Sequence, residues 1–270
     1  MRAGGWQFDS ETTAEPIGDS TWQLTLSDRW NIAQNSNGGY LAATALGSLG
    51  RLVEHPHAMT VTTHFLRPGI GGETADITGR VVKLGNRMST VAGTLSQLGK
   101  PRVEILAGFG DLDAGVAERS LSFPPPEMPT PDQCVNRVEL EQGVNLPILD
   151  RVDVMIRPDQ AVAGESLDAA VSGWIRLADG RPPDAAALVL FADAFPPSVF
   201  AKYGYIGWVP TLELTVQVRR VPSDGWICAV FETDDLQNGL FVESGSLWDS
   251  NGELVARSRQ VAMLREAEST

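Results

Sequence analysis

Polar and apolar residues alternate most cleanly between positions 211 and 219. Thr211 and Thr215 fall on the polar side of this pattern, and the leucines and valines between them fall on the other. A period of two is that of a β-strand with one buried face. Weaker alternation predicts further strands in both halves of the chain. They are 22–26, 60–65, 75–84, 88–97 and 102–109, followed by 152–156, 167–177, 226–233, 240–249 and 254–263.

Two segments carry a helical pattern instead. In 39–53, leucine and alanine recur every three or four residues, and Asn37-Gly38-Gly39 forms a turn that enters this helix. The segment 185–200 is apolar nearly all round, as in a buried helix, and its single acid, Asp193, stands out. Strands follow one another rather than alternating with helices, so the pattern predicts the α+β class.

The proline-rich stretch 122–131 divides the chain into two similar halves. Its five prolines exclude a helix or a central strand and predict an extended linker. A shift of 153 positions places Thr62 on Thr215, Arg67 on Arg220 and Gly99 on Gly252 without a gap. We therefore predict a first repeat over 1–112, a linker over 113–147 and a second repeat over 148–270, each a helix packed on a curved antiparallel sheet. The alternative is one domain, or two unrelated ones, with a coincidental match.

Composition narrows the classes of function. The chain has 270 residues and a formal net charge of −13, which argues against a protein that binds nucleic acid or docks on an anionic membrane. A few arginines can still form a local positive pocket for an anionic small molecule. Its apolar runs are too short for a membrane span, and its first residues lack the apolar core of a secretory signal. Cys134 and Cys228 stand apart from each other and from any histidine, so we expect buried or linker thiols and a cytoplasmic protein.

Several common catalytic motifs are missing from the sequence. It has no glycine-rich phosphate loop and no GxSxG nucleophile elbow, and no Cys/His cluster predicts a metal. His55 and His57 flank a proline in a predicted surface loop, and His64 is expected to be structural. We therefore expect neither a metal nor a cofactor.

Three polar residues of the second half stand where polarity needs an explanation. Asp193 interrupts an apolar helix, Thr211 begins the alternating strand, and Gln260 lies in the last strand. A helix that crosses the centre of a curved sheet brings such residues toward one water, whose proton a carboxylate can accept while a hydroxyl and an amide orient it. Each also has an ordinary interpretation: a cap at the helix break before Pro196, a strand residue, and an exposed edge residue.

The surrounding segments resemble a known family. PTLELTVQVRR (210–220), SLWDSNGELVARSRQVAMLR (246–265) and LVLFADAFPP (188–197) are similar to the second half of acyl-CoA thioesterase II and its bacterial thioesterase-like relatives. NGGYLAATAL (37–46) and HFLRPG (64–69) are similar to the first half, so the resemblance spans about 30–265. It implies a double hotdog fold, two helix-in-sheet units in one chain, which matches the repeat inferred above.

The resemblance also implies a reaction, the hydrolysis of acyl-CoA to fatty acid and CoA in lipid metabolism. Asp193, Thr211 and Gln260 would hold the water, with Asp193 as general base. The chain departs from the family at the threonine, because the family motif TIDHS is replaced here by TLELT, which leaves Thr215 as a same-face alternative. Under the 153 shift the first half has Tyr40, Ala58 and Ala107 at the corresponding places, so we expect no second water site.

Substrate contacts are predicted for four further residues. Gly38 and Gly39 would let backbone N–H groups approach the oxyanion, although a plain turn explains them equally well. Arg67 and Arg220 are candidates for the CoA phosphates, with solvated surface arginines as the alternative. Acyl-CoA is then the expected partner, and exposed sheet edges favour a homo-oligomer.

Two other functions remain open at this point. One is a hydratase or dehydratase acting on an acyl thioester, which usually pairs a histidine with an acid on the helix. The other is a non-catalytic hotdog protein that binds acyl-CoA or lipid.

Overall fold

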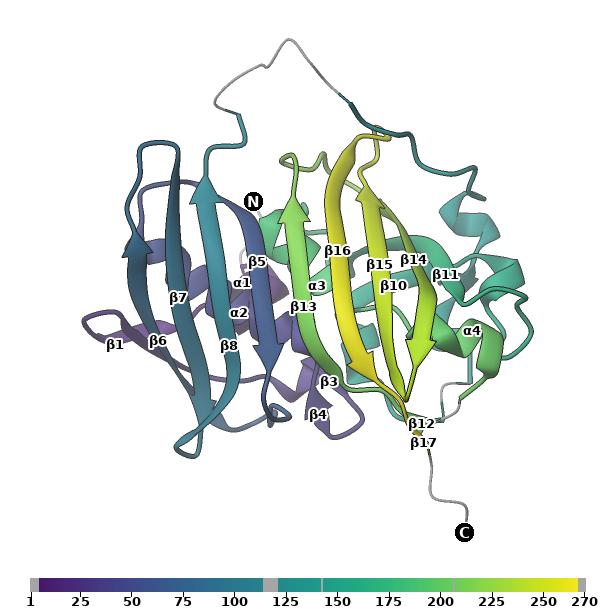
Figure 1. Cartoon of the computed structure of the whole chain (residues 1–270), viewed down its shortest axis with the longest axis horizontal. Coiled ribbons are helices and arrows are strands. Elements are labelled where there is room, and N and C mark those ends of the chain that lie inside the picture. The colour runs from purple at the N-terminus through teal and green to yellow at the C-terminus, as the bar shows by residue number, and fades with distance from the viewer. Residues whose placement is uncertain (1–4, 114–120, 142, 206, 267–270) are drawn as a thin grey trace.

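One antiparallel sheet of thirteen strands runs through the computed structural model, which describes residues 5–113, 121–141, 143–205 and 207–266 (Figure 1). The sheet order is β1-β2-β6-β7-β8-β5-β13-β16-β15-β14-β11-β10-β9. In the first half the strands are β1 (Glu15–Gly18), β2 (Thr21–Thr25), β5 (His57–Phe65), β6 (Thr74–Lys83), β7 (Met88–Gln97) and β8 (Lys100–Gly110). In the second half they are β9 (Val135–Asn136), β10 (Val152–Ile156), β11 (Ala170–Leu177), β13 (Thr211–Val218), β14 (Ile227–Gln237), β15 (Leu240–Trp248) and β16 (Leu254–Met263).

The helices lie on one face of this sheet, behind it in Figure 1. They are α1 (Gln7–Thr12), α2 (Gly38–Leu49), α3 (Ala185–Phe191) and α4 (Val199–Tyr203), with short 3-10 turns between elements. Two small strand pairs, β3 (Asn31–Ile32) with β4 (Asn35–Ser36) and β12 (Gly207–Trp208) with β17 (Arg265–Glu266), complete the described elements. The α+β class is confirmed, because the long strands follow one another directly along the chain.

The sheet has the same strand order outward from its centre in both directions. Moving away from β5 the strands are β8, β7, β6 and β2, and moving away from β13 they are β16, β15, β14 and β11. At the centre Thr62 pairs with Thr215, 153 residues later, and their hydroxyl oxygens are 2.9 Å apart. The flanking register keeps the same offset, since Val61 faces Ala107 and Leu214 faces Gln260.

A β-bulge also recurs at this offset. The register of β5 shifts between Ala58 and Thr60, and that of β13 shifts between Thr211 and Glu213. A bulge inserts one residue and turns the preceding side chain to the other face of the sheet. Strand geometry as well as strand order therefore repeats between the two halves.

The predicted helix over 185–200 is wrong in its second half. Helix α3 ends at Phe191, and α4 begins only at Val199. Pro196 and Pro197 account for the break, because proline lacks an N–H group and disfavours helical geometry at the residue before it. Asp193 consequently lies in the turn after α3 rather than on the helix.

The predicted correspondence of Tyr40 with Asp193 is also wrong. Asn37 caps α2 and Asp184 caps α3, each side chain accepting a hydrogen bond from the backbone N–H three residues later. These caps align the helices 147 positions apart, whereas the strands align at 153. Tyr40 lies in the first turn of α2, where its ring stacks on Trp30, with centroids 5.2 Å apart.

The proline-rich segment is extended, as predicted, and it packs along the second half. The Trp174 and Trp248 indole N–H groups donate to the carbonyls of Pro129 and Phe123, at 2.7 and 3.1 Å. Part of the predicted linker, residues 114–120, lies outside the described residues. Cys134 and Cys228 are both buried and free. Among the described residues, no helix is long and apolar enough to cross a membrane.

Candidate active site

A cavity of about 540 Å³ opens between the two halves of the chain. The start of α2, the end of β5 and the following loop line it from the first half, and the turn after α3 and the starts and middles of β13, β15 and β16 line it from the second. Asp193, Thr211 and Gln260 are all among its lining residues. The three residues predicted to hold a water therefore reach one shared space.

The Asp193 carboxylate is held by groups from the first half of the chain. The Asn37 side-chain amide donates to Asp193 Oδ2 at 2.9 Å and to the Asp193 carbonyl at 2.8 Å, and the Gly39 N–H donates to Oδ2 at 2.8 Å. Burial raises the pKa of Asp193 to about 6, while the Gly39 N–H and the Thr211 hydroxyl oppose this rise. A carboxyl group with such a pKa is ionised at neutral pH and can still take up a proton.

The bulge in β13 turns Thr211 toward Asp193. Its Oγ1 lies 3.3 Å from Asp193 Oδ1 and 3.1 Å from Gln260 Oε1. Simple alternation predicted one face for Thr211 and Thr215, but the bulge places them on opposite faces. Thr215 bonds to Thr62 and Glu213 outside the cavity, so the geometry favours Thr211 of the two.

Sequence reasoning missed two buried residues of this site, Asn37 as a side-chain donor and Glu243. Glu243 lies in β15 directly opposite Gln260, and its Oε1 accepts a hydrogen bond from Gln260 Nε2. A signal for it existed, because Glu243 takes an inward position between the buried Phe241 and Leu247. A carboxylate at such a position needs partners.

Family models match both halves of the chain. The acyl-CoA thioesterase N-terminal domain matches residues 26–110, and the acyl-CoA thioesterase C-terminal domain matches residues 124–264. The chain belongs to the acyl-CoA thioesterase family. The resemblance inferred from the sequence is thereby confirmed.

Solved structures agree with membership of the acyl-CoA thioesterase family. A protein from Thermobifida fusca described as a thioesterase II is 31% identical, with a TM-score of 0.88 over 97% of this chain and 98% of that one. A hotdog-fold protein of unknown function from Alicyclobacillus acidocaldarius is 21% identical, with a TM-score of 0.84 over 98% and 100%. An acyl-CoA thioesterase II from Mycobacterium marinum is 20% identical, with a TM-score of 0.75 over 97% and 99%. The predicted hotdog fold is confirmed.

In this family member, Gly38 and Gly39 let the backbone at the start of α2 approach Asp193 closely, whereas the sequence predicted an approach to the substrate oxyanion. A β-carbon on Gly39 would lie 2.8 Å from the Leu190 carbonyl oxygen and 3.0 Å from Asp193 Cβ, and one on Gly38 would lie 2.9 Å from Asp193 Oδ2. The Gly39 N–H, predicted to meet an oxyanion, instead donates to the carboxylate. Gly38 lines the cavity, and its contact with substrate stays a prediction.

The two predicted phosphate-binding arginines of this acyl-CoA thioesterase family member lie in different places. Arg67 lines the cavity and is exposed, as is Arg265, which sequence reasoning missed. Arg220 is not a lining residue and lies 3.5 Å from Glu253 in an exposed ion pair. Arg137, from the predicted linker, is buried in the cavity wall and donates to the Ala194 carbonyl. The structure thus brings Arg67 to the site and leaves Arg220 outside it.

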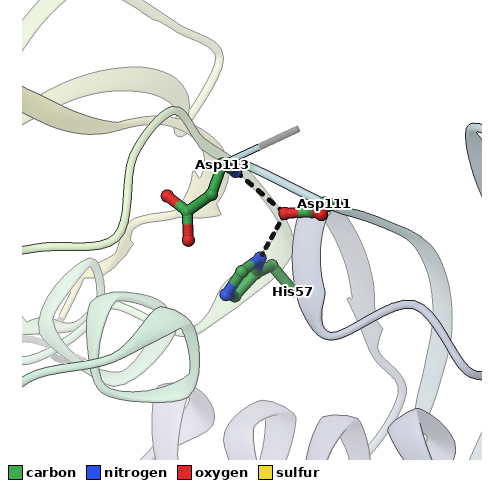
Figure 2. Close-up of side chains that lie close together, drawn as sticks. All are labelled: His57, Asp111 and Asp113. Carbon is green, nitrogen blue, oxygen red and sulfur yellow. Dashed lines mark hydrogen bonds and ion pairs between the residues drawn. The ribbon is translucent and has the colours of Figure 1, made fainter. Parts of the chain in front are cut away.

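No histidine is among the described residues that line the cavity. His64 is exposed on β5, and His57 lies where β5 begins, near the end of β8. Figure 2 shows His57 beside Asp111 and Asp113, with its Nδ1 3.7 Å from Asp111 Oδ1. Nδ1 also accepts from the Leu112 N–H, and Asp111 Oδ1 accepts from the Asp113 N–H. This cluster ties the chain after β8 to the start of β5, away from the cavity.

Proposed function

We propose that this chain hydrolyses acyl-CoA to a free fatty acid and CoA with a water held by Asp193, Thr211 and Gln260. The observation that carries the proposal is the convergence of a carboxylate, a hydroxyl and an amide on one cavity wall, with oxygen separations of 3.1 and 3.3 Å around Thr211. Family membership supports thioester chemistry, and the arrangement supplies a base with two orienting groups.

The proton and bond changes of the proposed reaction balance with these side chains and the water. Asp193 takes a proton as the water oxygen attacks the thioester carbonyl, and the tetrahedral intermediate expels the CoA sulfur. The same proton then passes from Asp193 to the departing thiolate, which completes the balance. The positive end of α2 favours the ionised state of Asp193 before attack, because the Gly39 N–H points at its carboxylate.

The lining of the cavity fits an acyl chain linked to a phosphorylated carrier. Apolar side chains such as Leu41, Phe65 and Phe231 line its interior, whereas Arg67 and Arg265 are exposed where it meets solvent. An acyl chain binds favourably to the apolar lining, because this contact removes apolar surface from water. A guanidinium group can donate two parallel hydrogen bonds to the oxygens of one phosphate. We therefore assign Arg67 and Arg265 to the phosphates of CoA.

Thiol release measured across a series of acyl-CoA chain lengths tests this function, with binding of the same compounds measured by calorimetry. We expect both binding and release of CoA. Binding without release would favour the non-catalytic acyl-CoA-binding alternative. Formation or loss of a double bond in the acyl chain would favour a hydratase or dehydratase, which the lack of a described lining histidine speaks against.

The pH dependence of hydrolysis follows from the pKa of Asp193. The carboxylate must be ionised to accept a proton, and burial raises its pKa to about 6. We expect kcat/KM to be constant at neutral pH and to fall about tenfold per pH unit well below pH 6. A profile that stays flat down to about pH 4.5 would contradict Asp193 as the base.

Replacement of the two predicted arginines separates a substrate contact from a surface residue. We expect Arg67→Ala to raise KM about tenfold with little change in kcat, because it removes a contact made equally in the ground and transition states. Arg220→Ala is the matched control and should leave both constants unchanged. Equal effects of the two changes on KM would contradict the assignment.

The repeat is also part of the proposal. We assign a double hotdog with repeats over 1–112 and 148–270 and a linker over 113–147, supported by the shared strand order, register offset and bulge. A cytoplasmic location, a role in fatty acid metabolism and a homo-oligomeric state remain predictions, the last measurable by light scattering.

A further inference from the structure

Glu243 is a buried carboxylate that the proposed mechanism does not use. Its side chain is 4% exposed and lines the cavity beside Gln260. Both of its oxygens accept hydrogen bonds, Oε2 from the Ser198 N–H at 2.7 Å and Oε1 from Gln260 Nε2. Burial raises the pKa of Glu243, and the hydrogen bonds from Ser198 and Gln260 oppose this rise.

The position of Glu243 follows from strand register. Glu243 and Gln260 are direct partners on β15 and β16, so their side chains leave the sheet on the same face and meet. Ser198 lies at the far end of the turn that begins with Asp193. Glu243 therefore links this turn to the strand that carries Gln260.

The hydrogen bond from Gln260 to Glu243 has a direction. Gln260 Nε2 donates to Glu243 Oε1, so the NH₂ group of the amide faces Glu243 and its carbonyl Oε1 faces away. Oε1 lies 3.1 Å from Thr211 Oγ1 as a result. A half-turn of the amide would keep the same shape but would present donors, not an acceptor, to Thr211 and the water.

We propose that Glu243 is a positioning residue that fixes the Gln260 amide with its carbonyl oxygen toward Thr211 and the hydrolytic water. This inference rests on the proposed thioesterase function, which it deepens. Two acceptors, Asp193 and Gln260 Oε1, then receive the two hydrogens of the water, and a lone pair of its oxygen is free to attack the thioester.

The change Glu243→Gln tests the proposal without leaving the turn unsupported. The new amide oxygen can accept from the Ser198 N–H, but its NH₂ group then faces Gln260, which must turn its own amide to accept. We expect kcat to fall about 100-fold with KM within about twofold of wild type, since a misdirected group in a site costs about that much. Glu232→Gln, which removes a charge from an exposed position on the neighbouring strand β14, is the matched control and should leave kcat unchanged.

A double change provides the rescue. In Glu243→Gln with Gln260→Glu, the new carboxylate at 260 accepts from the amide at 243 and again presents an oxygen to Thr211. We expect a recovery of kcat of about tenfold or more over Glu243→Gln alone. A double variant no faster than the single one, or a single variant as fast as wild type, would overturn the positioning role.

Hydrogen exchange of the Gln260 side-chain amide gives a readout that does not depend on turnover. Its NMR signal is assigned by its loss in Gln260→Ala. We expect slow exchange in wild type and Glu232→Gln, and exchange faster by about tenfold or more in Glu243→Gln, where the amide faces the cavity. If wild type releases no thiol from any acyl-CoA, the proposed function fails, while this exchange still decides whether Glu243 orients Gln260; unchanged exchange would refute the orientation.

Discussion

Replacing Asp193 with asparagine is expected to lower kcat/KM for acyl-CoA by about 10³- to 10⁴-fold, because a proposed general base is lost. The asparagine keeps an oxygen for the Asn37 and Gly39 donors and places an NH₂ group near Thr211, so the turn keeps its hydrogen bonds. Thiol release in single turnovers measures the loss.

The same change, Asp193→Asn, is expected to keep or raise the stability of the fold at neutral pH while it lowers activity. The pKa of Asp193 is about 6 in the folded chain, against an ordinary value of 3.8 for an aspartate in water. The folded state thus holds a proton that the unfolded state has released between these pH values, and stability falls as pH rises through this window. At neutral pH the uncharged asparagine removes that penalty, so we expect a Tm equal to or above that of wild type.

Asp184→Asn is the matched control for Asp193→Asn. Asp184 caps the other end of α3, and asparagine is an equally good capping residue. We expect near wild-type turnover from it. Substantial hydrolysis by Asp193→Asn, or an equal loss in both variants, would refute the role of Asp193.

Gly39→Ala is expected to destabilise the fold by about 1–3 kcal/mol and to lower kcat about 100-fold. The added methyl group would meet backbone atoms of Leu190 at 2.8 and 2.9 Å, and backbone cannot swing aside as a side chain can. Helix α2 must then move away from the turn that carries Asp193. This movement lengthens the hydrogen bond from the Gly39 N–H to the Asp193 carboxylate. Chemical denaturation and steady-state kinetics measure the two effects.

Gly47→Ala is the control within the same helix. Gly47 is exposed, and a β-carbon added there would meet no other atom within 4 Å, so alanine should stabilise α2 by about 0.5–1 kcal/mol and leave kcat unchanged. Unaltered kinetics and stability in Gly39→Ala would show that the two helices do not need this close contact.

Much of the strand framework could be predicted from alternation alone. The predicted ranges 88–97, 152–156 and 254–263 coincide with β7, β10 and β16, because a half-buried strand must alternate. The prediction of one helix over 185–200 was wrong for a local reason that the sequence shows, the pair Pro196-Pro197. The apolar composition of the segment did not indicate the break, because a buried turn and a buried helix have similar composition.

The face of Thr211 could not be predicted in the same way. Alternation continues through the bulge without a break in the sequence, and only the pairing with β16 shows that one residue is extra. The role of Arg137 is comparable, because its place in the cavity wall depends on how a chain segment with little regular structure folds back. Glu243 differs from both. Its inward position could be predicted from the alternation along 240–248, and its pairing with Gln260 follows from the register of β15 and β16.

The proposed base and the groups that hold it come from opposite halves of the chain. Asn37 and Gly39 precede Asp193 by 156 and 154 residues, and neither repeat alone contains both the carboxylate and its donors. Under the proposed function, hydrolysis therefore depends on residues from both halves of the chain. Because the two halves are joined in one chain, the carboxylate and the groups that hold it are always made in equal number.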